Sequence, residues 1–240
     1  MNIPWQRHAD FWSAFVPPRN VDVWLPPGYD AAGEQRYPVL YMHDGKNLFE
    51  PEQSFSGVTW GVAEALQAGI TDGTLPPTII VGIWNTDNRF GEYMPQAPIT
   101  LEADSQQRFD DWAAVYQPMN YGQLCSDEYL RFLVEELKPF IDRSYTTAPD
   151  PAHTAIMGSS MGGLISIYAL CEYPEVFGRA GCLSTHWPVG DGIMEPYLTQ
   201  KLPTAGRHRV YYDHGTEGLD AGYAPYQARV DAIMQSAGYQ

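Results

Sequence analysis

The residues with the clearest chemical potential form the stretch Gly158-Ser159-Ser160-Met161-Gly162. A short apolar run, Thr154–Met157, precedes this stretch, and a longer apolar run, Leu164–Leu170, follows it. This order predicts a buried strand, a tight turn and an apolar helix, which is the setting of a nucleophile elbow with Ser160 at its centre. Glycines are expected beside such a serine because a Cβ would collide with the neighbouring strand and helix. The pattern therefore predicts a serine nucleophile at a helix N-terminus, where unpaired N–H groups favour negative charge.

A serine hydroxyl becomes an efficient nucleophile only with a base, a group that orients the base, and donors for the oxyanion. The first expected oxyanion donor is the backbone N–H of Met161, the residue after the nucleophile. The second is the backbone N–H of Gly45 or Lys46, in the loop that follows the apolar run Tyr37–Met42. These donors would stabilise the tetrahedral intermediate of acyl transfer.

The orienting acid is expected in the loop after the predicted strand Arg209–His214, because acid follows serine along the chain in this arrangement. Glu217 and Asp220 both lie in that loop. Asp220 is the preferred candidate, and Glu217 is the alternative. Acids are also common in glycine-rich turns for purely structural reasons.

The base is harder to place, because no histidine follows Asp220 in the sequence. His186 and His214 are the candidates for a relocated base, His186 because it lies in a loop after a predicted strand. His43 precedes the serine in the chain, so we expect it, with Asp44, to be a structural or pocket residue rather than the base.

The elements that must position these residues alternate between strands and helices. This alternation predicts one α/β domain over 1–240 with a mostly parallel sheet flanked by helices. Regular patterning disappears over 85–125, which we interpret as an irregular lid or pocket wall. Tyr93 within that segment, together with His186 and Trp187, completes the candidate pocket residues. The strands and helices predicted outside the segment span 21–25, 37–42, 58–68, 78–83, 126–142, 154–157, 164–173, 181–184, 209–214 and 223–237.

The composition excludes several classes of function. The net charge of −15 would repel phosphate backbones, so nucleic-acid binding is not expected. No run approaches 18 apolar residues, and the N-terminus lacks the features of a signal peptide, so we expect a cytoplasmic protein without a membrane span. The 3 cysteines have no spacing typical of a zinc site or a disulfide framework.

Four motifs together resemble the putative-esterase family of α/β-hydrolases, which includes esterase D-like enzymes, feruloyl and acetyl-xylan esterases, and siderophore trilactone esterases. The motifs are Tyr41–Phe49, Glu92–Pro95, Gly158–Gly163 and Tyr212–Glu217. The resemblance covers nearly the whole chain from about Val21. It implies an α/β-hydrolase fold and hydrolysis of a small-molecule carboxylic ester through an acyl-enzyme on Ser160, with neither a metal nor an organic cofactor.

The resemblance also implies a departure at the end of the chain. Members of this family continue with a further strand, a loop that carries the catalytic histidine, and a closing helix. We therefore expect the sequence to be truncated, with the catalytic histidine lost beyond residue 240 and this form weakly active or inactive. Two alternatives remain: a non-catalytic binding module that keeps the hydrolase fold, and an esterase with its base at His186 or His214.

Overall fold

The computed structural model describes residues 5–115 and 122–239. Within these residues one seven-stranded sheet has the order β1-β2-β4-β3-β5-β6-β7. β1 and β2 are antiparallel to their neighbours, whereas β3 to β7 run parallel. The strands are β1 (Trp5–Phe11), β2 (Arg19–Trp24), β3 (Val39–Met42), β4 (Ile79–Ile83), β5 (Thr154–Ser159), β6 (Arg179–Leu183) and β7 (Arg209–Asp213).

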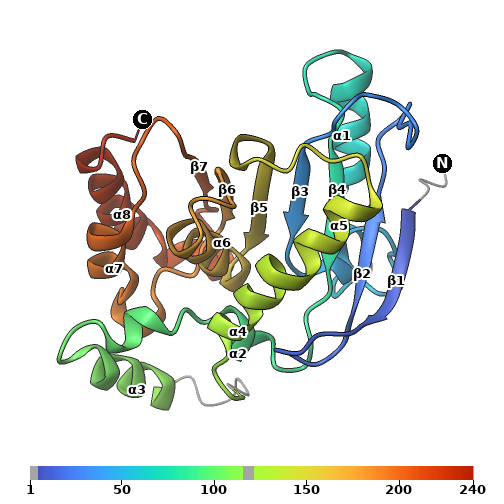
Figure 1. Ribbon diagram of the computed structural model, residues 1–240. Helices are drawn as coiled ribbons and strands as arrows, with labels where there is room; N and C mark the ends of the chain where they lie inside the picture. The colour runs from blue at the N-terminus through green and yellow to red at the C-terminus, as the bar shows by residue number, and fades with distance from the viewer. Residues whose placement is uncertain (1–4, 116–121, 240) are drawn as a thin grey trace.

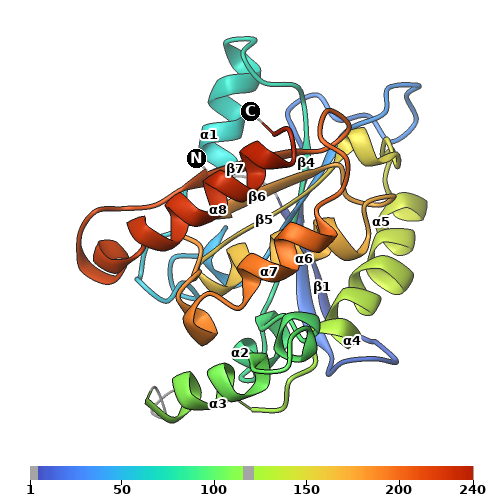
Figure 2. The same ribbon diagram turned by 90° about the vertical axis from the view of Figure 1, so that its left-hand side faces the viewer.

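Helices connect and cover the strands. α5 crosses in front of β2, β3 and β4, while α7 and α8 lie at the β7 end of the sheet (Figure 1). α2 and α3 lie together at the end of the molecule opposite α1 in both views (Figures 1 and 2). The helices are α1 (Val62–Thr71), α2 (Arg89–Tyr93), α3 (Ser105–Val115), α4 (Ser126–Arg131), α5 (Lys138–Ser144), α6 (Met161–Glu172), α7 (Met194–Lys201) and α8 (Ala224–Ser236).

The central strands are the continuous apolar runs of the sequence. β3 pairs with β4 through Val39 and Ile79, and with β5 through Val39 and Thr154. Every residue of β4 is buried, as expected for a parallel strand that is covered on both faces. The carboxyl ends of β3, β5 and β6 therefore meet at one edge of the sheet, and the loops after these strands are neighbours there.

The two faces of the sheet are covered unequally. The larger core cluster joins α4 to α8 with one face, and it includes Leu164, Ile167, Tyr197 and Val230. The smaller cluster packs α1 against Trp24, Leu40, Met42, Ile80 and Met157 of β2 to β5. In β7, exposed and half-buried residues alternate, and Tyr211 is 60% exposed. One face of β7 is therefore open in this structure.

Several predictions about elements need correction. β1 and α7 were absent from the sequence-based assignment. The segment 85–125, predicted to be irregular, contains α2, a 3₁₀ turn at Ala97–Thr100 and α3. Residues 116–121 of that segment lie outside the described residues. The helix predicted over 126–142 is α4 and α5, joined by a π-helical turn at Phe132–Leu137.

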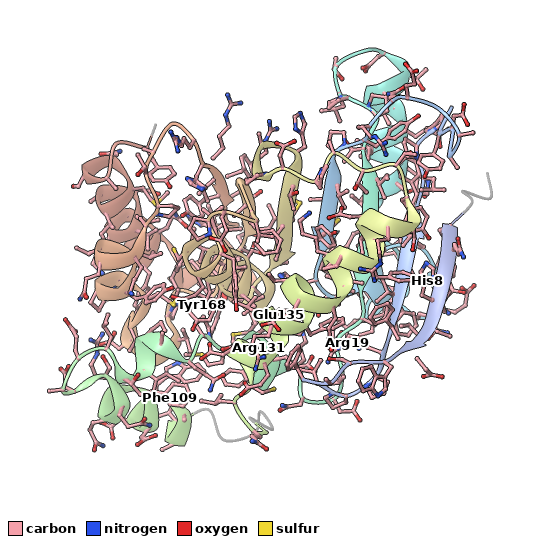
Figure 3. All side chains as sticks on the ribbon, in the orientation of Figure 1. His8, Arg19, Phe109, Arg131, Glu135 and Tyr168 are labelled. Carbon is pink, nitrogen blue, oxygen red and sulfur yellow. The ribbon has the colours of Figure 1, made fainter. Side chains whose placement is uncertain are left out.

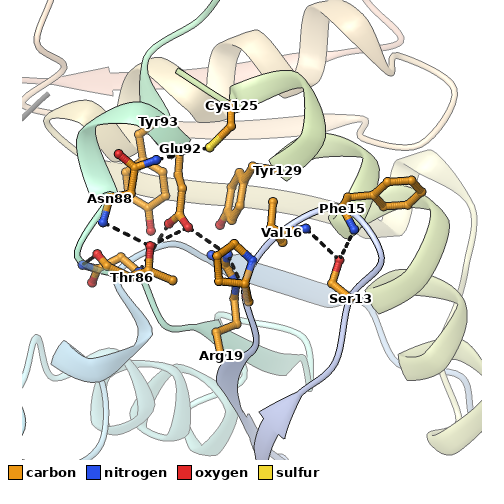
Figure 4. Close-up of polar contacts among 12 residues, drawn as sticks. Ser13, Phe15, Val16, Arg19, Thr86, Asn88, Glu92, Tyr93, Cys125 and Tyr129 are labelled. Atoms are coloured by element: carbon orange, nitrogen blue, oxygen red, sulfur yellow. Dashed lines mark hydrogen bonds and ion pairs between the residues drawn. The ribbon is translucent and has the colours of Figure 1, made fainter. Parts of the chain in front are cut away.

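A buried ion pair joins β2 to α2. Arg19 Nη2 donates to Glu92 Oε1 over 2.8 Å, and both side chains are 1% exposed. Thr86 Oγ1 donates to the same carboxylate over 2.7 Å. Figure 4 shows this network beside Tyr129, over whose ring the Arg19 guanidinium lies. The pair holds the start of the 85–125 segment against the antiparallel end of the sheet.

Candidate active site

Ser160 lies in a strained turn between β5 and α6. Its backbone angles are φ 59° and ψ −116°, a region that residues other than glycine rarely occupy. The Ser160 N–H donates to the Leu183 carbonyl on β6 over 2.9 Å, which holds the turn against the next strand. A Cβ on Gly158 would lie 2.8 Å from the backbone carbon of Gly162. The turn therefore has no room for a side chain at Gly158, as the motif predicts.

The two predicted sources of oxyanion donors lie on adjacent segments. Met161 is the first residue of α6, so its N–H has no acceptor within the helix. Gly45 begins a 3₁₀ turn after β3, and a Cβ on Gly45 would lie 2.5 Å from the Gly82 backbone on β4. A Cβ on Gly162 would lie 3.6 Å from the Asp44 carboxylate. The loop after β3 is therefore packed against the first turn of α6.

Asp44 is held in the left-handed region, at φ 57°, immediately before this turn. Its carboxylate accepts two hydrogen bonds from Arg89, at 2.6 Å from Nε and 2.7 Å from Nη2. Its backbone N–H donates to the Tyr93 hydroxyl over 3.1 Å. Arg89 was not among the predicted site residues, although its place in the motif-bearing segment with Tyr93 was a usable signal. This pair fixes the loop that carries Gly45 and Lys46.

His43 is a buried, neutral histidine. Its Nδ1 lies 2.8 Å from the Tyr129 hydroxyl, and its ring packs 5.1 Å from that of Tyr93. Burial, and then the charge of Arg89, lower the pKa of His43 to about 3. His43 thus contributes to the support of the loop, and its contacts do not include the Ser160 hydroxyl.

His186 lies beside Ser160. Its backbone N–H donates to the Ser160 carbonyl over 3.3 Å, and its Nδ1 lies 2.7 Å from the Tyr223 hydroxyl. The Trp112 ring of α3 packs 5.9 Å from the imidazole. Burial, and then the Arg89 charge, lower the pKa of His186. Neither Tyr223 nor Trp112 was predicted as a site residue, because the sequence does not show that α3 and α8 converge on this loop.

Trp187 corrects the predicted pocket. The side chain is 1% exposed, and its Nε1 donates to Gln227 Oε1 on α8 over 2.8 Å. Its ring packs against Tyr212 of β7 at 5.8 Å. Trp187 therefore belongs to the core beneath α8. Its neighbour His186 lies on the side of this loop that faces Ser160.

The two candidate acids differ in their surroundings. Asp220 Oδ2 accepts hydrogen bonds from Ser184 Oγ and from the Gly215 N–H, both at 2.7 Å. Burial, and then the Asp220 charge, raise the pKa of Tyr223. Glu217 is exposed. Asp220 is therefore tied by hydrogen bonds to the loops after β6 and β7, whereas Glu217 is exposed to solvent.

The other histidines contact residues remote from Ser160. His214 Nδ1 lies 2.7 Å from the Gly215 carbonyl, and His153 pairs with Asp150. His208 lies beside the Pro174 carbonyl at the start of β7. His8 lies on β1, at the opposite end of the sheet from β6 (Figure 3). Among the six histidines, all in the described part of the chain, His186 is the one that contacts Ser160.

A hollow of about 370 Å³ opens beside Trp112. It lies between α3, the loop after β6 and the first turns of α8, so it adjoins the His186 side of the elbow. Its size suits a small organic group. The lining residues are Arg108, Asp111, Trp112, Val115, Pro188, Asp191 and Tyr226.

Over 5–115 and 122–239, no group of three or more His, Cys, Asp or Glu side chains could hold a metal ion. The same ranges hold no helix that is both long and apolar enough to cross a membrane.

Comparison with known proteins decides the family. Residues 13–229 match a family model described as "Putative esterase". The chain belongs to this esterase family. An IroE-like serine hydrolase from Shewanella oneidensis superposes with a TM-score of 0.70 at 21% identity, over 98% of this chain and 69% of that one. The esterase-family chain thus has an α/β-hydrolase fold, with a mostly parallel central sheet flanked by helices.

Two curated relatives of this esterase-family chain are similar in sequence. The "Uncharacterized protein YbbA" of Bacillus subtilis is 27% identical over 83% of this chain and 68% of its own length. The "Endo-1,4-beta-xylanase/feruloyl esterase" of Xylanibacter ruminicola is 27% identical over 79% of this chain and 23% of its own length. The chain thus spans about two thirds of the first relative and under a quarter of the second.

Proposed function

We propose that this protein is a serine hydrolase of carboxylic esters that forms an acyl-enzyme on Ser160. The observation that carries the proposal is the strained elbow: Ser160 stands at the N-terminus of α6, and the loop of Gly45 and Lys46 is packed against the same turn. Membership of the esterase family supports the reaction class.

The reaction has two halves. Ser160 Oγ attacks the ester carbonyl, its proton passes to a base, and the carbonyl oxygen becomes an oxyanion. The N–H groups of Met161 and of Gly45 or Lys46 would donate to that oxygen. The intermediate collapses with loss of the alcohol, which takes up the proton. Water then attacks the acyl-enzyme in the same way and releases the acid. Asp220 is the proposed orienting acid.

The source of the base remains a prediction. The family resemblance predicts a histidine encoded after residue 240, and the reading frame downstream of codon 240 tests this directly. An in-frame continuation that carries a histidine would agree with it. A stop codon immediately after residue 240 would contradict it and leave the base to the residues of this chain.

Covalent labelling tests Ser160 as an activated nucleophile. Diisopropyl fluorophosphate should add one phosphoryl group to the protein, and peptide mass spectrometry should place it on Ser160. Ser160→Ala should take up no label and should lose hydrolysis of p-nitrophenyl acetate, p-nitrophenyl butyrate and methyl ferulate. Ser159→Ala, which removes the adjacent hydroxyl, is the matched control and should keep both properties.

Equal rates of hydrolysis by the wild type and Ser160→Ala would contradict the serine mechanism. Absence of label from a folded wild-type protein would contradict an activated Ser160 in this form of the protein. Labelling at Ser160 with slow turnover would support Ser160 as the nucleophile and indicate that proton transfer limits turnover.

A further inference from the structure

The Arg89 guanidinium is partly exposed next to the loop after β3. Its Nε and Nη2 groups donate to the two oxygens of Asp44 over 2.6 and 2.7 Å, and its centre lies 5.1 Å from that of the Tyr93 ring. Within residues 5–115 and 122–239, no group accepts a hydrogen bond from Nη1. The Arg89 side chain is 35% exposed, whereas that of Asp44 is 4% exposed. The Nη1 edge is therefore the part of the guanidinium that a ligand can contact.

Asp44 joins Arg89 to the first turn of α6. The Asp44 Oδ2 atom, which accepts from Arg89 Nη2, would lie 3.6 Å from a Cβ on Gly162. Gly162 is the second residue after Ser160. One carboxylate oxygen thus separates the guanidinium from the turn that carries the proposed nucleophile.

α2 also reaches the loop after β6. The ring of Phe90, the residue after Arg89, stacks on that of Trp112 at 5.9 Å, and Trp112 packs 5.9 Å from His186. In the sheet, β5 lies between β3 and β6, so Ser160 lies between the loops that follow those two strands. The guanidinium at the start of α2 is therefore beside the space above Ser160.

Lys46 is a second cation on the loop after β3. It is half-buried in the 3₁₀ turn that begins at Gly45. In the described part of the chain no carboxylate pairs with Lys46, whereas Lys138 pairs with Asp142 over 2.7 Å. The N-terminus of α6, a helix of 12 residues, adds positive potential at the same edge of the sheet.

A carboxylate is the chemical group that suits these donors, because guanidinium and ammonium groups form charge-assisted hydrogen bonds with it. The net charge of −15 repels anions at long range, so a preference for a carboxylate must come from nearby cations. The proposed oxyanion donors are backbone N–H groups. The side chains of Arg89 and Lys46 are therefore available to a second group of the same substrate.

We propose that Arg89 and Lys46 bind a carboxylate carried by the ester substrate, so that the protein prefers monoesters of dicarboxylic acids. The ester carbonyl would lie at Ser160, and the free carboxylate would accept from Arg89 Nη1 and from the Lys46 ammonium. The inference rests on the proposed function, because it assigns a substrate class to the same site.

Isothermal titration calorimetry on the Ser160→Ala variant measures this preference without turnover. The probes are the monomethyl esters of succinic, glutaric and adipic acid. Each is compared with the methyl ester in which a neutral carboxamide replaces the carboxylate. In at least one pair the carboxylate should bind about 10–100-fold more tightly, the range expected for hydrogen bonds to a charged group.

The ratio of the two dissociation constants separates recognition of the carboxylate from support of the loop. Arg89→Gln also leaves the buried Asp44 carboxylate without its partner, and loss of support alone would weaken both ligands and keep the ratio. Recognition predicts that both Arg89→Gln and Lys46→Gln lower the ratio toward 1. Arg131→Gln and Lys201→Gln, at an exposed arginine and an exposed lysine, are the matched controls and should keep the parent ratio.

Equal dissociation constants in all three pairs, or a ratio that neither Arg89→Gln nor Lys46→Gln lowers, would overturn the proposal. Labelling of Ser160 by diisopropyl fluorophosphate would in that case still support the proposed function, since the two failures have different readouts. A carboxylate preference in a protein whose Ser160 takes no label would support the binding site and contradict the reaction.

Discussion

Single residues at this site owe their properties to burial more than to identity. His43 and His186 are both histidines next to the elbow loops. His43 is fully buried against Tyr129, and the pKa of its imidazole falls to about 3, whereas His186 borders Ser160. The same charge, that of Arg89, acts on both rings. One histidine is therefore a packing residue, whereas the other lies beside Ser160.

His43 predicts a dependence of stability on pH. The folded protein keeps His43 neutral down to about pH 3, whereas the unfolded chain protonates it below about 6.5. The unfolded state thus binds more protons in this window, and stability falls as pH falls from 6.5 toward 3. Between pH 7 and pH 5 the loss from this residue is ~2 kcal/mol.

Urea unfolding at pH 7 and pH 5 measures this loss. His43→Gln removes the titrating group, so its free energy of unfolding should fall less between the two values than that of the wild type. His153→Gln, at an exposed histidine, is the control and should retain the wild-type difference. Identical pH differences in wild type and His43→Gln would rule out His43 as the cause.

At the scale of elements, the close approach of β5 to α6 determines the backbone conformation of the turn between them. Gly158 faces Gly162 across the turn, and Gly163 faces Thr185 of the loop after β6. These contacts hold the strained Ser160 backbone in place, since a conformation of this kind persists only where its surroundings determine it.

Gly158→Ala should therefore disturb stability and the site together. The new Cβ would lie 2.8 Å from the Gly162 backbone, and overpacking of this kind costs about 1–3 kcal/mol. We also expect slower labelling of Ser160 by diisopropyl fluorophosphate, because the turn must shift. Gly222→Ala, where a Cβ has open space, is the control. Unchanged urea unfolding and labelling in Gly158→Ala would contradict the packing argument.

How far the sequence predicts these elements depends on whether their residues form a continuous apolar run or a mixture of polar and apolar residues. β3, β4 and the elbow were predictable because buried parallel strands are continuous apolar runs. β1 was not, because Trp5–Phe11 is a mixed, half-exposed edge strand with polar residues at most positions. α3 was missed because its buried residues, Phe109 and Trp112, are spread among charged ones. The meeting of His186 with Tyr223 depends on tertiary packing that no local pattern encodes.

At the scale of the whole molecule, the antiparallel end of the sheet and the site are joined through α2. Arg19 on β2 binds Glu92 on α2, and α2 also carries Arg89, whose guanidinium holds Asp44. The Arg19 guanidinium also lies over the rings of Tyr129 and Phe132. Support of the proposed oxyanion loop thus extends from β2 to the carboxyl end of β3.

Glu92→Gln tests this connection. The change leaves the Arg19 charge buried without its carboxylate, and the free energy of unfolding should fall by about 3–5 kcal/mol in urea titrations. Glu135→Gln, in the exposed pair with Arg131, is the matched control and should leave it unchanged (Figure 3). A similar effect of the two substitutions would show that the buried pair contributes no more than a surface pair.

The strand order has a consequence for synthesis of the chain. β3 pairs with β4, which follows after α1, and with β5, which follows only after α2 to α5. At usual translation rates, the ribosome needs roughly 5–20 s to reach β5 after β3. During that time the edge of β3 that will pair with β5 has no partner strand. The nascent chain must avoid pairing this edge with other strands. Ser160, which directly follows β5, therefore takes its place after the loop that is proposed to stabilise its oxyanion.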